Sequence, residues 1–200
     1  MRGILIVISG PAGVGKGTVV SKILERNPEI KLSISKTTRN PRFNEVNGVN
    51  YFFTSKEEFI RDIEEDNLLE YAEYNNNFYG TPKDFVFNML NEGFDVILEI
   101  ETKGALDVKK RFPDSILIFI LPPSMNELYK RLKGRGTETD DEILSRMKIA
   151  ENEIKKIYQY DYFVINDSID KTVFAIENII FAEKQRTKRF DLNSFISGVN

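Results

Sequence analysis

The sequence has 200 residues and contains neither cysteine nor histidine. The absence of cysteine excludes a disulfide scaffold, a thiolate zinc site and a thiol nucleophile. The absence of histidine excludes a Ser-His-Asp triad and metal sites built on imidazole. The fold therefore has to rest on a hydrophobic core, and the chemistry has to come from other side chains.

Strong positive charge and long apolar runs are also missing. The formal net charge is -3, which argues against broad nucleic-acid binding because that binding depends on neutralising phosphates. The apolar run Ile4–Ile8 is far too short to cross a bilayer, and no small-residue cleavage site follows it. We therefore expect no nucleic-acid partner, no membrane partner and no secretion signal, and a cytoplasmic location.

The apolar pattern predicts an α/β fold. Four short apolar runs are typical of strands buried on both faces of a parallel sheet: Ile4–Ile8, Val96–Leu98, Ile116–Leu121 and Tyr162–Ile165. Helical patterns lie between them, and three of these begin with a capping box, at Ser55, Ser124 and Thr139. A last helix is expected from about Ser168 to Lys188. This alternation predicts a parallel sheet flanked by helices on both faces.

Two stretches interrupt the alternation. Residues from Ser33 to about Pro82 are richer in polar and aromatic side chains, which predicts a small inserted subdomain with short strands. Lys133 to Thr139 is rich in glycine, arginine and threonine, which predicts a mobile loop between two helices. The tail after Phe190 has turn formers and few apolar residues, so we expect it to be loosely held.

A phosphate-binding loop follows the first predicted strand directly. Its glycines let several backbone N–H groups face one anion, the following helix adds its positive end, and the lysine adds a full charge. The segment comprises Gly10, Pro11, Ala12, Gly13, Val14, Gly15, Lys16, Gly17 and Thr18. The usual pattern has Ser or Thr directly after the lysine, whereas here Gly17 stands there and the hydroxyl comes at Thr18. Direct and water-mediated contact of Thr18 with Mg²⁺ both stay open.

Further segments resemble guanylate kinase, which phosphorylates GMP to GDP with ATP. The resemblance covers about Gly3 to Arg189. It rests on the loop above and on the segments Ser35–Arg42, Glu45–Phe53, Tyr79–Thr81, Leu98–Glu101, Arg131–Glu138 and Phe181–Lys184. It implies a fold like that of the phosphate-loop nucleoside triphosphate hydrolases, with a nucleotide-monophosphate-binding subdomain and a lid. It also implies Mg²⁺ as the cofactor that accompanies ATP.

The resemblance implies a GMP site made of a cationic part and an acidic part. Arg39 and Arg42 lie three residues apart across a turn and can converge on the acceptor phosphate. Ionised carboxylates accept the two donors on the guanine edge, a role that the resemblance gives to Glu70 and Glu101. It gives the O6 region of the base to the hydroxyls of Ser35 and Thr81. The implied GMP-site residues are Ser35, Arg39, Arg42, Tyr51, Glu70, Tyr79, Thr81 and Glu101. The plainer alternatives are a solvated loop for the two arginines, strand packing for Tyr51, and an ordinary surface carboxylate for Glu70.

One segment departs from the family pattern. The family most often has aspartate at the position of Glu101, followed by a Gln-Gly pair where this chain has Lys103 and Gly104. The extra methylene lengthens the reach of Glu101, and Lys103 replaces a neutral amide with a charge. Glu99 ends the preceding strand and is expected to organise Mg²⁺ through water. The alternative for Glu99 is a solvent-facing strand end.

The implied catalytic cations are Lys16 and three lid arginines. Arg135 and Arg146 are expected to stabilise the transferred phosphoryl group, with Arg131 in support. The alternative for these arginines is a set of surface ion pairs with Glu138, Asp141 or Glu142. Asn166 matches a position that contacts the ATP adenine in the family, although an Asn-Asp pair also caps a helix well.

We therefore predict a single guanylate kinase-like domain at 1–190. Its core is 1–32, 83–123 and 151–190, its GMP-binding subdomain is 33–82, its lid is 124–150, and the tail is 191–200. The predicted reaction is transfer of the ATP γ-phosphoryl group to GMP, with dGMP or another monophosphate as alternative acceptors. A competing hypothesis is a protein-interaction module, but such modules usually lose the lysine and lid arginines that this chain keeps.

Overall fold

A five-stranded parallel sheet forms the centre of the protein. The structure is a computed structural model and describes residues 2–74, 76–134 and 139–198. The strand order is β2 (Ile30–Leu32), β7 (Asp95–Glu99), β1 (Leu5–Ser9), β8 (Ile116–Leu121) and β9 (Tyr162–Ile165). Four of these are the predicted apolar runs. The sequence pattern missed β2, because a strand of three residues leaves too short an apolar signal.

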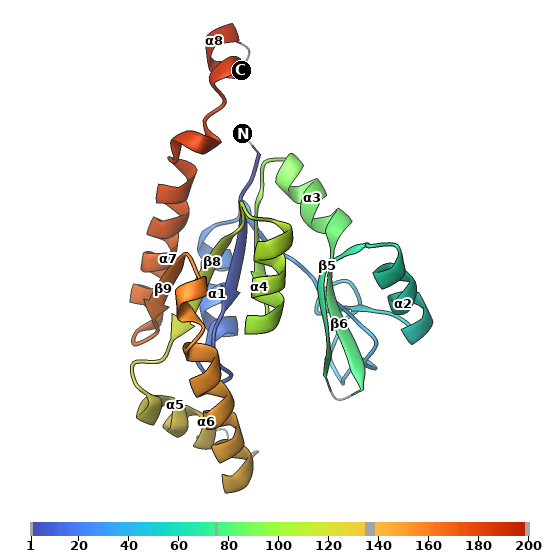
Figure 1. Cartoon of the computed structure of the whole chain (residues 1–200), viewed down its shortest axis with the longest axis vertical. Coiled ribbons are helices and arrows are strands. Elements are labelled where there is room, and N and C mark those ends of the chain that lie inside the picture. Colours follow the sequence, from blue (N-terminus) through green and yellow to red (C-terminus); the bar gives the residue numbers. More distant parts are fainter. Residues whose placement is uncertain (1, 75, 135–138, 199–200) are drawn as a thin grey trace.

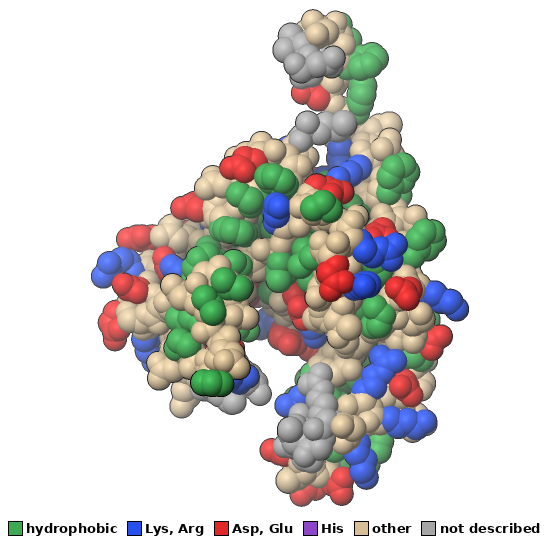
Figure 2. Space-filling model, turned by 180° about the vertical axis from the view of Figure 1, so that it is seen from behind, with side chains coloured by type: hydrophobic (Ala, Val, Ile, Leu, Met, Phe, Trp, Pro, Cys, Tyr) green, Lys and Arg blue, Asp and Glu red, His purple; other side chains and the backbone are tan. Residues whose placement is uncertain are grey.

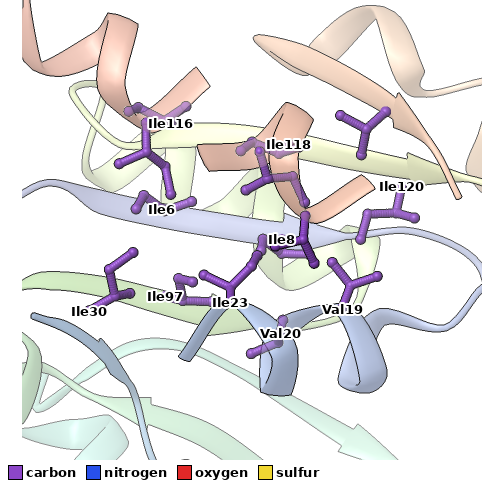
Figure 3. Close-up of a cluster of buried hydrophobic side chains, with 14 of the residues drawn as sticks. Ile6, Ile8, Val19, Val20, Ile23, Ile30, Ile97, Ile116, Ile118 and Ile120 are labelled. Atoms are coloured by element: carbon purple, nitrogen blue, oxygen red, sulfur yellow. The ribbon is translucent and has the colours of Figure 1, made fainter. Parts of the chain in front are cut away.

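Helices cover both faces of this sheet (Figure 1). On one face, α1 (Lys16–Arg26) and α7 (Ile169–Lys184) pack against the isoleucines of the strands. Figure 3 shows Val19, Val20 and Ile23 of α1 among these isoleucines. On the other face lie α3 (Lys83–Asn91) and α4 (Thr102–Arg111). Two covered faces explain why the strands are apolar at every position rather than at alternate ones.

A second sheet lies between β2 and α3 in the chain. Its order is β4 (Phe52–Phe53), β3 (Lys36–Thr37), β6 (Asn77–Pro82) and β5 (Leu68–Tyr74), and its strands run in mixed directions. Helix α2 (Lys56–Glu64) packs on it through the buried side chain of Phe59, which stacks on Phe78. The predicted capping box at Ser55 is present at the start of α2. All of these elements fall within residues 33–82.

Helices α5 (Met125–Lys133) and α6 (Asp140–Ile154) form a separate projection below the central sheet (Figure 1). They share a small apolar cluster of Leu128, Leu132, Ile143 and Ala150. Thr139 forms the predicted capping box of α6. At α5 the Ser124 side chain accepts from the Glu127 N–H, but the reciprocal bond from Glu127 that would complete the predicted capping box does not form. Most of the predicted loop between them lies outside the described residues. Figure 2 shows an open notch between this projection and the lobe of the second sheet.

The C-terminal segment differs from the sequence prediction. Helix α7 ends at Lys184 instead of Lys188, because Arg186 and Arg189 turn back and bond the buried carboxylate of Glu183. The expected loose tail contains a short helix, α8 (Leu192–Ser197), which projects beyond the rest of the molecule (Figure 1). No helix in the described ranges combines the length and apolarity needed to cross a membrane.

Candidate functional site

The phosphate loop joins β1 to α1 at the centre of the sheet. Gly13 and Gly15 have φ values of 86° and 98°, a region that side chains rarely adopt, and Gly15 is the N-cap of α1. The Nζ atom of Lys16 donates a 2.5 Å hydrogen bond to the Gly10 carbonyl. The loop is thus folded back on its own lysine, and the first turn of α1 offers N–H groups that lack helical partners.

A buried amide supports this loop from behind. The Asn166 side chain is 2% exposed, and its Nδ2 atom donates a 2.8 Å hydrogen bond to the Val14 carbonyl. Its Oδ1 atom accepts from the Thr172 hydroxyl at 3.1 Å. A Cβ atom at Gly15 would lie 2.7 Å from Nδ2. The Asn166 side chain therefore holds the phosphate loop by binding the backbone of that loop. Asn166 does not cap α7, because the N-cap of that helix is Ser168.

Arg131 joins the same support from α5. Its Nη1 atom donates to the Val14 carbonyl at 3.3 Å and its Nη2 atom donates to the Asn166 carbonyl at 3.1 Å. The Nε atom donates to Glu127 at 3.2 Å. This arginine therefore links α5 to the phosphate loop. Of the other two predicted lid arginines, Arg146 lies on α6 and Arg135 lies outside the described residues.

The end of β7 brings a carboxylate to the start of α1. Glu99 pairs in register with Ile8, and its two carboxylate oxygens lie 3.6 and 3.7 Å from where a Cβ atom of Gly17 would be. Burial raises the pKa of Glu99, and the positive charge of Lys16 opposes that rise. Thr18 is exposed on the same first turn of α1. A hydroxyl and a carboxylate beside a phosphate loop are oxygen donors of the kind that suit Mg²⁺.

A cavity of about 540 Å³ lies between the phosphate loop and the second sheet. It brings together residues that are far apart in the sequence. Among its lining residues are five predicted GMP-site residues and two residues of the phosphate side: Ser35, Tyr51, Glu70, Tyr79, Glu101, Lys16 and Glu99. Arg39, Arg42 and Thr81 do not line it directly.

Glu70 is a buried carboxylate that faces this cavity from β5. It is 8% exposed, and its Oε1 atom accepts a 2.8 Å hydrogen bond from the Thr81 hydroxyl on β6. Burial raises the pKa of Glu70 to about 6, and the Thr81 hydrogen bond and the charge of Lys103 limit that rise. Thr81 is buried as well, so its hydroxyl orients the carboxylate in this structure.

A cationic and aromatic cluster lies beside the cavity. The Arg39 guanidinium makes two 2.9 Å hydrogen bonds to the carboxylate of Glu45, which also holds the backbone N–H of Arg42 at 2.7 Å. Arg39 lies over the ring of Tyr51, with 5.5 Å from its guanidinium carbon to the ring centre, and Tyr51 contacts Tyr79 edge to face. The Arg42 side chain is exposed. Arg39 and the two tyrosine rings therefore form one packed group.

Glu101 directly precedes α4 and is the N-cap residue of that helix. Its side chain is 70% exposed, and its Oε1 atom is 3.9 Å from the Nζ atom of Lys16. The next residue, Thr102, donates a 3.3 Å hydrogen bond to Glu153 of α6. Helix α6 therefore touches the element that carries Glu101.

Two residues that line the cavity were not among the predicted site residues. Ser33 lines it with a buried hydroxyl that lacks a hydrogen-bond partner among the described residues, and Lys103 lines it from the first turn of α4. Ser33 belongs to no recognisable spacing pattern, whereas Lys103 stood out in the sequence only as a departure from the family pattern. The proximity of Lys103 to Glu70 depends on the packing of α4 against β5, which no local signal reveals.

Comparisons with known proteins identify the family of this sequence. The sequence model described as "Guanylate kinase" matches residues 2–183. The guanylate kinase of Caldanaerobacter subterraneus subsp. tengcongensis is 55% identical over 188 residues, which are 94% of this chain and 91% of that protein. That of Clostridium perfringens is 53% identical over 192 residues, which are 96% of this chain and 89% of that protein.

A solved structure is similar as well. The crystal structure of guanylate kinase from Anaplasma phagocytophilum has a TM-score of 0.78 and 34% sequence identity, covering 99% of this chain and 95% of that one. The chain belongs to the guanylate kinase family, the phosphotransferases that use ATP to phosphorylate GMP.

Proposed function

We propose that this chain transfers the ATP γ-phosphoryl group to GMP at the junction of the phosphate loop and the cavity. The observation that carries the proposal is that Lys16 and Glu70 line the same cavity. One supplies a cation at the phosphate loop, and the other supplies a carboxylate for a base. A nucleoside monophosphate between them would direct its phosphate toward the phosphate loop.

Guanine selection is assigned to Glu70. The guanine edge presents an N1–H and an exocyclic NH₂, and an ionised carboxylate accepts both. Adenine has neither a hydrogen at N1 nor an amino group at C2, so AMP would leave the buried carboxylate without both donors. Ser35 and Glu101 line the same cavity and are proposed as further contacts to the nucleoside, while Thr81 acts through Glu70.

The acceptor phosphate is assigned to Arg39, Arg42, Tyr51 and Tyr79. Glu45 holds Arg39 and the Arg42 backbone in place before a nucleotide arrives. A guanidinium fork matches phosphate oxygens, and phenolic O–H groups can donate to the same oxygens. We propose that Arg39 exchanges part of its contact with Glu45 for the phosphate.

The donor site is assigned to residues 10–18 together with the support from Asn166. In the proposed reaction, Lys16 holds the β- and γ-phosphates while an oxygen of the GMP phosphate attacks in line. Arg135 and Arg146 stabilise the negative charge on the transferring group, and Arg131 supports them by linking α5 to the phosphate loop. The acceptor oxygen is already anionic, so the step needs no general base.

Thr18 and Glu99 are the residues proposed to hold Mg²⁺, directly or through water. Their oxygen atoms and the partly buried charge of Glu99 fit a hard cation that also binds substrate phosphates. When bound, Mg²⁺ neutralises charge on the phosphates of ATP. The placement of Glu99 against Gly17 keeps this carboxylate next to the first turn of α1.

The test is release of ADP from ATP and Mg²⁺ with separate acceptors: GMP, dGMP, AMP, CMP, UMP and dTMP. We expect turnover with the guanine nucleotides alone and its loss in Glu70→Gln. Turnover with AMP or a pyrimidine nucleotide would refute the role of Glu70. Binding of GMP without turnover of any acceptor would favour an interaction module instead.

A further inference from the structure

Lys103 occupies the wall of the cavity next to Glu70. It is an exposed residue in the first turn of α4 and lines the same cavity as the carboxylate. The next residue, Gly104, marks how close the two elements are, because a Cβ atom there would lie 2.8 Å from Oε2 of Glu70. The first turn of α4 is therefore the surface against which Glu70 lies.

The Lys103 ammonium group has no competing partner in the described parts of the chain. It makes no ion pair or hydrogen bond with another described residue, whereas Lys16 bonds the Gly10 carbonyl and Lys110 pairs with Asp107. Its charge lowers the pKa of Glu70, although burial, the Thr81 hydrogen bond and the charge of Asp107 all have larger effects on that pKa. A donor group is thus available at the acidic end of the cavity.

Guanine offers acceptors for such a donor beside the carboxylate. Next to its N1–H it carries O6, which is an acceptor, and N7 lies beyond O6 as a second acceptor, so a lysine can bind here together with the Ser35 hydroxyl that lines the same cavity. In protein–DNA complexes, arginine and lysine contacts with O6 and N7 are the commonest specific contacts to guanine. Adenine carries an amino group at the position of O6, so an ammonium group there would face another donor.

We infer that Lys103 is a specificity-determining residue that donates a hydrogen bond to O6 of guanine while Glu70 accepts from N1–H and the amino group. The inference rests on the proposed function, in which Glu70 holds the guanine base. Together the two side chains read an acceptor and two adjacent donors, a pattern that adenine lacks. Tyr51 and Tyr79, which line the same cavity, and Arg39, which packs on Tyr51, remain for the phosphate.

The experiment compares GMP with 6-thio-GMP, in which a weaker acceptor replaces O6, in the wild type and in Lys103→Met. We expect Lys103→Met to lower kcat/KM for GMP by about tenfold or more, mainly through KM, because a hydrogen bond from a charged donor is lost. The wild type should prefer GMP over 6-thio-GMP, and Lys103→Met should lose most of that preference. Lys103→Arg should restore it in part.

Lys110→Met is the matched control, because it removes one lysine charge from the same helix at a position outside the cavity. It should keep the wild-type preference for GMP. If Lys103→Met keeps the wild-type preference for GMP over 6-thio-GMP, the inference is wrong. This holds even if the acid limb of the pH profile moves, because Lys103 would then act only on the charge of Glu70 and not on O6. Thermal melting of each variant separates these outcomes from a loss of folding.

Glu70→Gln in the same assay distinguishes a failure of the proposed function from a failure of the Lys103 assignment. If Glu70→Gln keeps its GMP activity, the proposed function of this cavity fails. If Glu70→Gln loses activity and Lys103→Met retains the wild-type preference, the proposed function stands and the assignment of Lys103 alone is wrong.

Discussion

The Thr81 hydroxyl donates a 2.8 Å hydrogen bond to a carboxylate oxygen of Glu70, and both side chains are buried. The second sheet makes this contact, since Glu70 lies on β5 and Thr81 on the neighbouring β6. The bond favours the charged form of Glu70 and so limits the rise in its pKa that burial causes. Four predictions follow from this pair and from the support of the phosphate loop.

The activity with GMP should fall at acidic pH. Because the pKa of Glu70 is raised to about 6, lowering the pH below that value protonates the carboxyl and removes the acceptor for guanine. We expect kcat/KM for GMP to decrease about tenfold per pH unit below this point. The measurement is a pH profile of kcat/KM for GMP at saturating ATP, and the residual activity of Glu70→Gln should lack this limb. A profile that is flat down to pH 4.5 would contradict the prediction.

Glu70→Gln should change how stability depends on pH. The pKa of Glu70 is 4.5 in an ordinary setting and about 6 here. Its contribution to stability is therefore full below pH 4.5 and is lost as the pH rises through about 6. The neutral amide of Gln does not titrate. Relative to the wild type, the unfolding free energy of the variant should therefore increase by up to about 2 kcal/mol between pH 4 and pH 8.

Urea unfolding of the wild type and Glu70→Gln at both pH values tests this gain. An identical difference in unfolding free energy at the two pH values would show that Glu70 has the same pKa in the folded and unfolded chain. The expected result is a protein that is more stable at neutral pH and less active, because the functional charge is costly to bury.

Thr81→Val should move the acid limb of the activity profile to higher pH. The hydroxyl favours the charged form of Glu70, so its removal raises the pKa of that carboxyl further. Thr81→Ser keeps the hydroxyl and should stay close to the wild type. The comparison uses the pH profiles of the two variants, and coincident profiles would mean that the Thr81 hydrogen bond does not control Glu70.

Asn166→Leu should weaken ATP use more than GMP use. It removes the donor to the Val14 carbonyl and leaves that buried oxygen with fewer partners, which costs about 1–3 kcal/mol. We expect a higher KM for ATP, a lower melting temperature and little change in KM for GMP. Thr172→Val removes a hydroxyl that contacts Asn166 and the Ile165 and Ser168 carbonyls but not the phosphate loop, so it should raise the KM for ATP less. Equal increases in both KM values would contradict a role confined to the phosphate loop.

The sequence alone determined the features that depend on neighbouring residues. The phosphate loop is a contiguous glycine-rich segment between a strand and a helix, so its composition specifies its conformation. The long buried strands were equally predictable from the sequence, because a strand that is covered on both faces needs apolar residues throughout. The helix starts at Ser55 and Thr139 were predictable from capping boxes that span only four residues.

The tertiary structure decided the contacts between distant segments. Asn166 reaches the Val14 carbonyl across 152 positions of sequence, and Arg131 reaches it across 117. Lys103 meets Glu70 only because α4 packs against β5. Such contacts arise from packing that buries apolar surface, which is non-directional and leaves no spacing in the sequence. Residue chemistry therefore indicated which side chains could bind nucleotides, and only the fold determined which of them share one cavity.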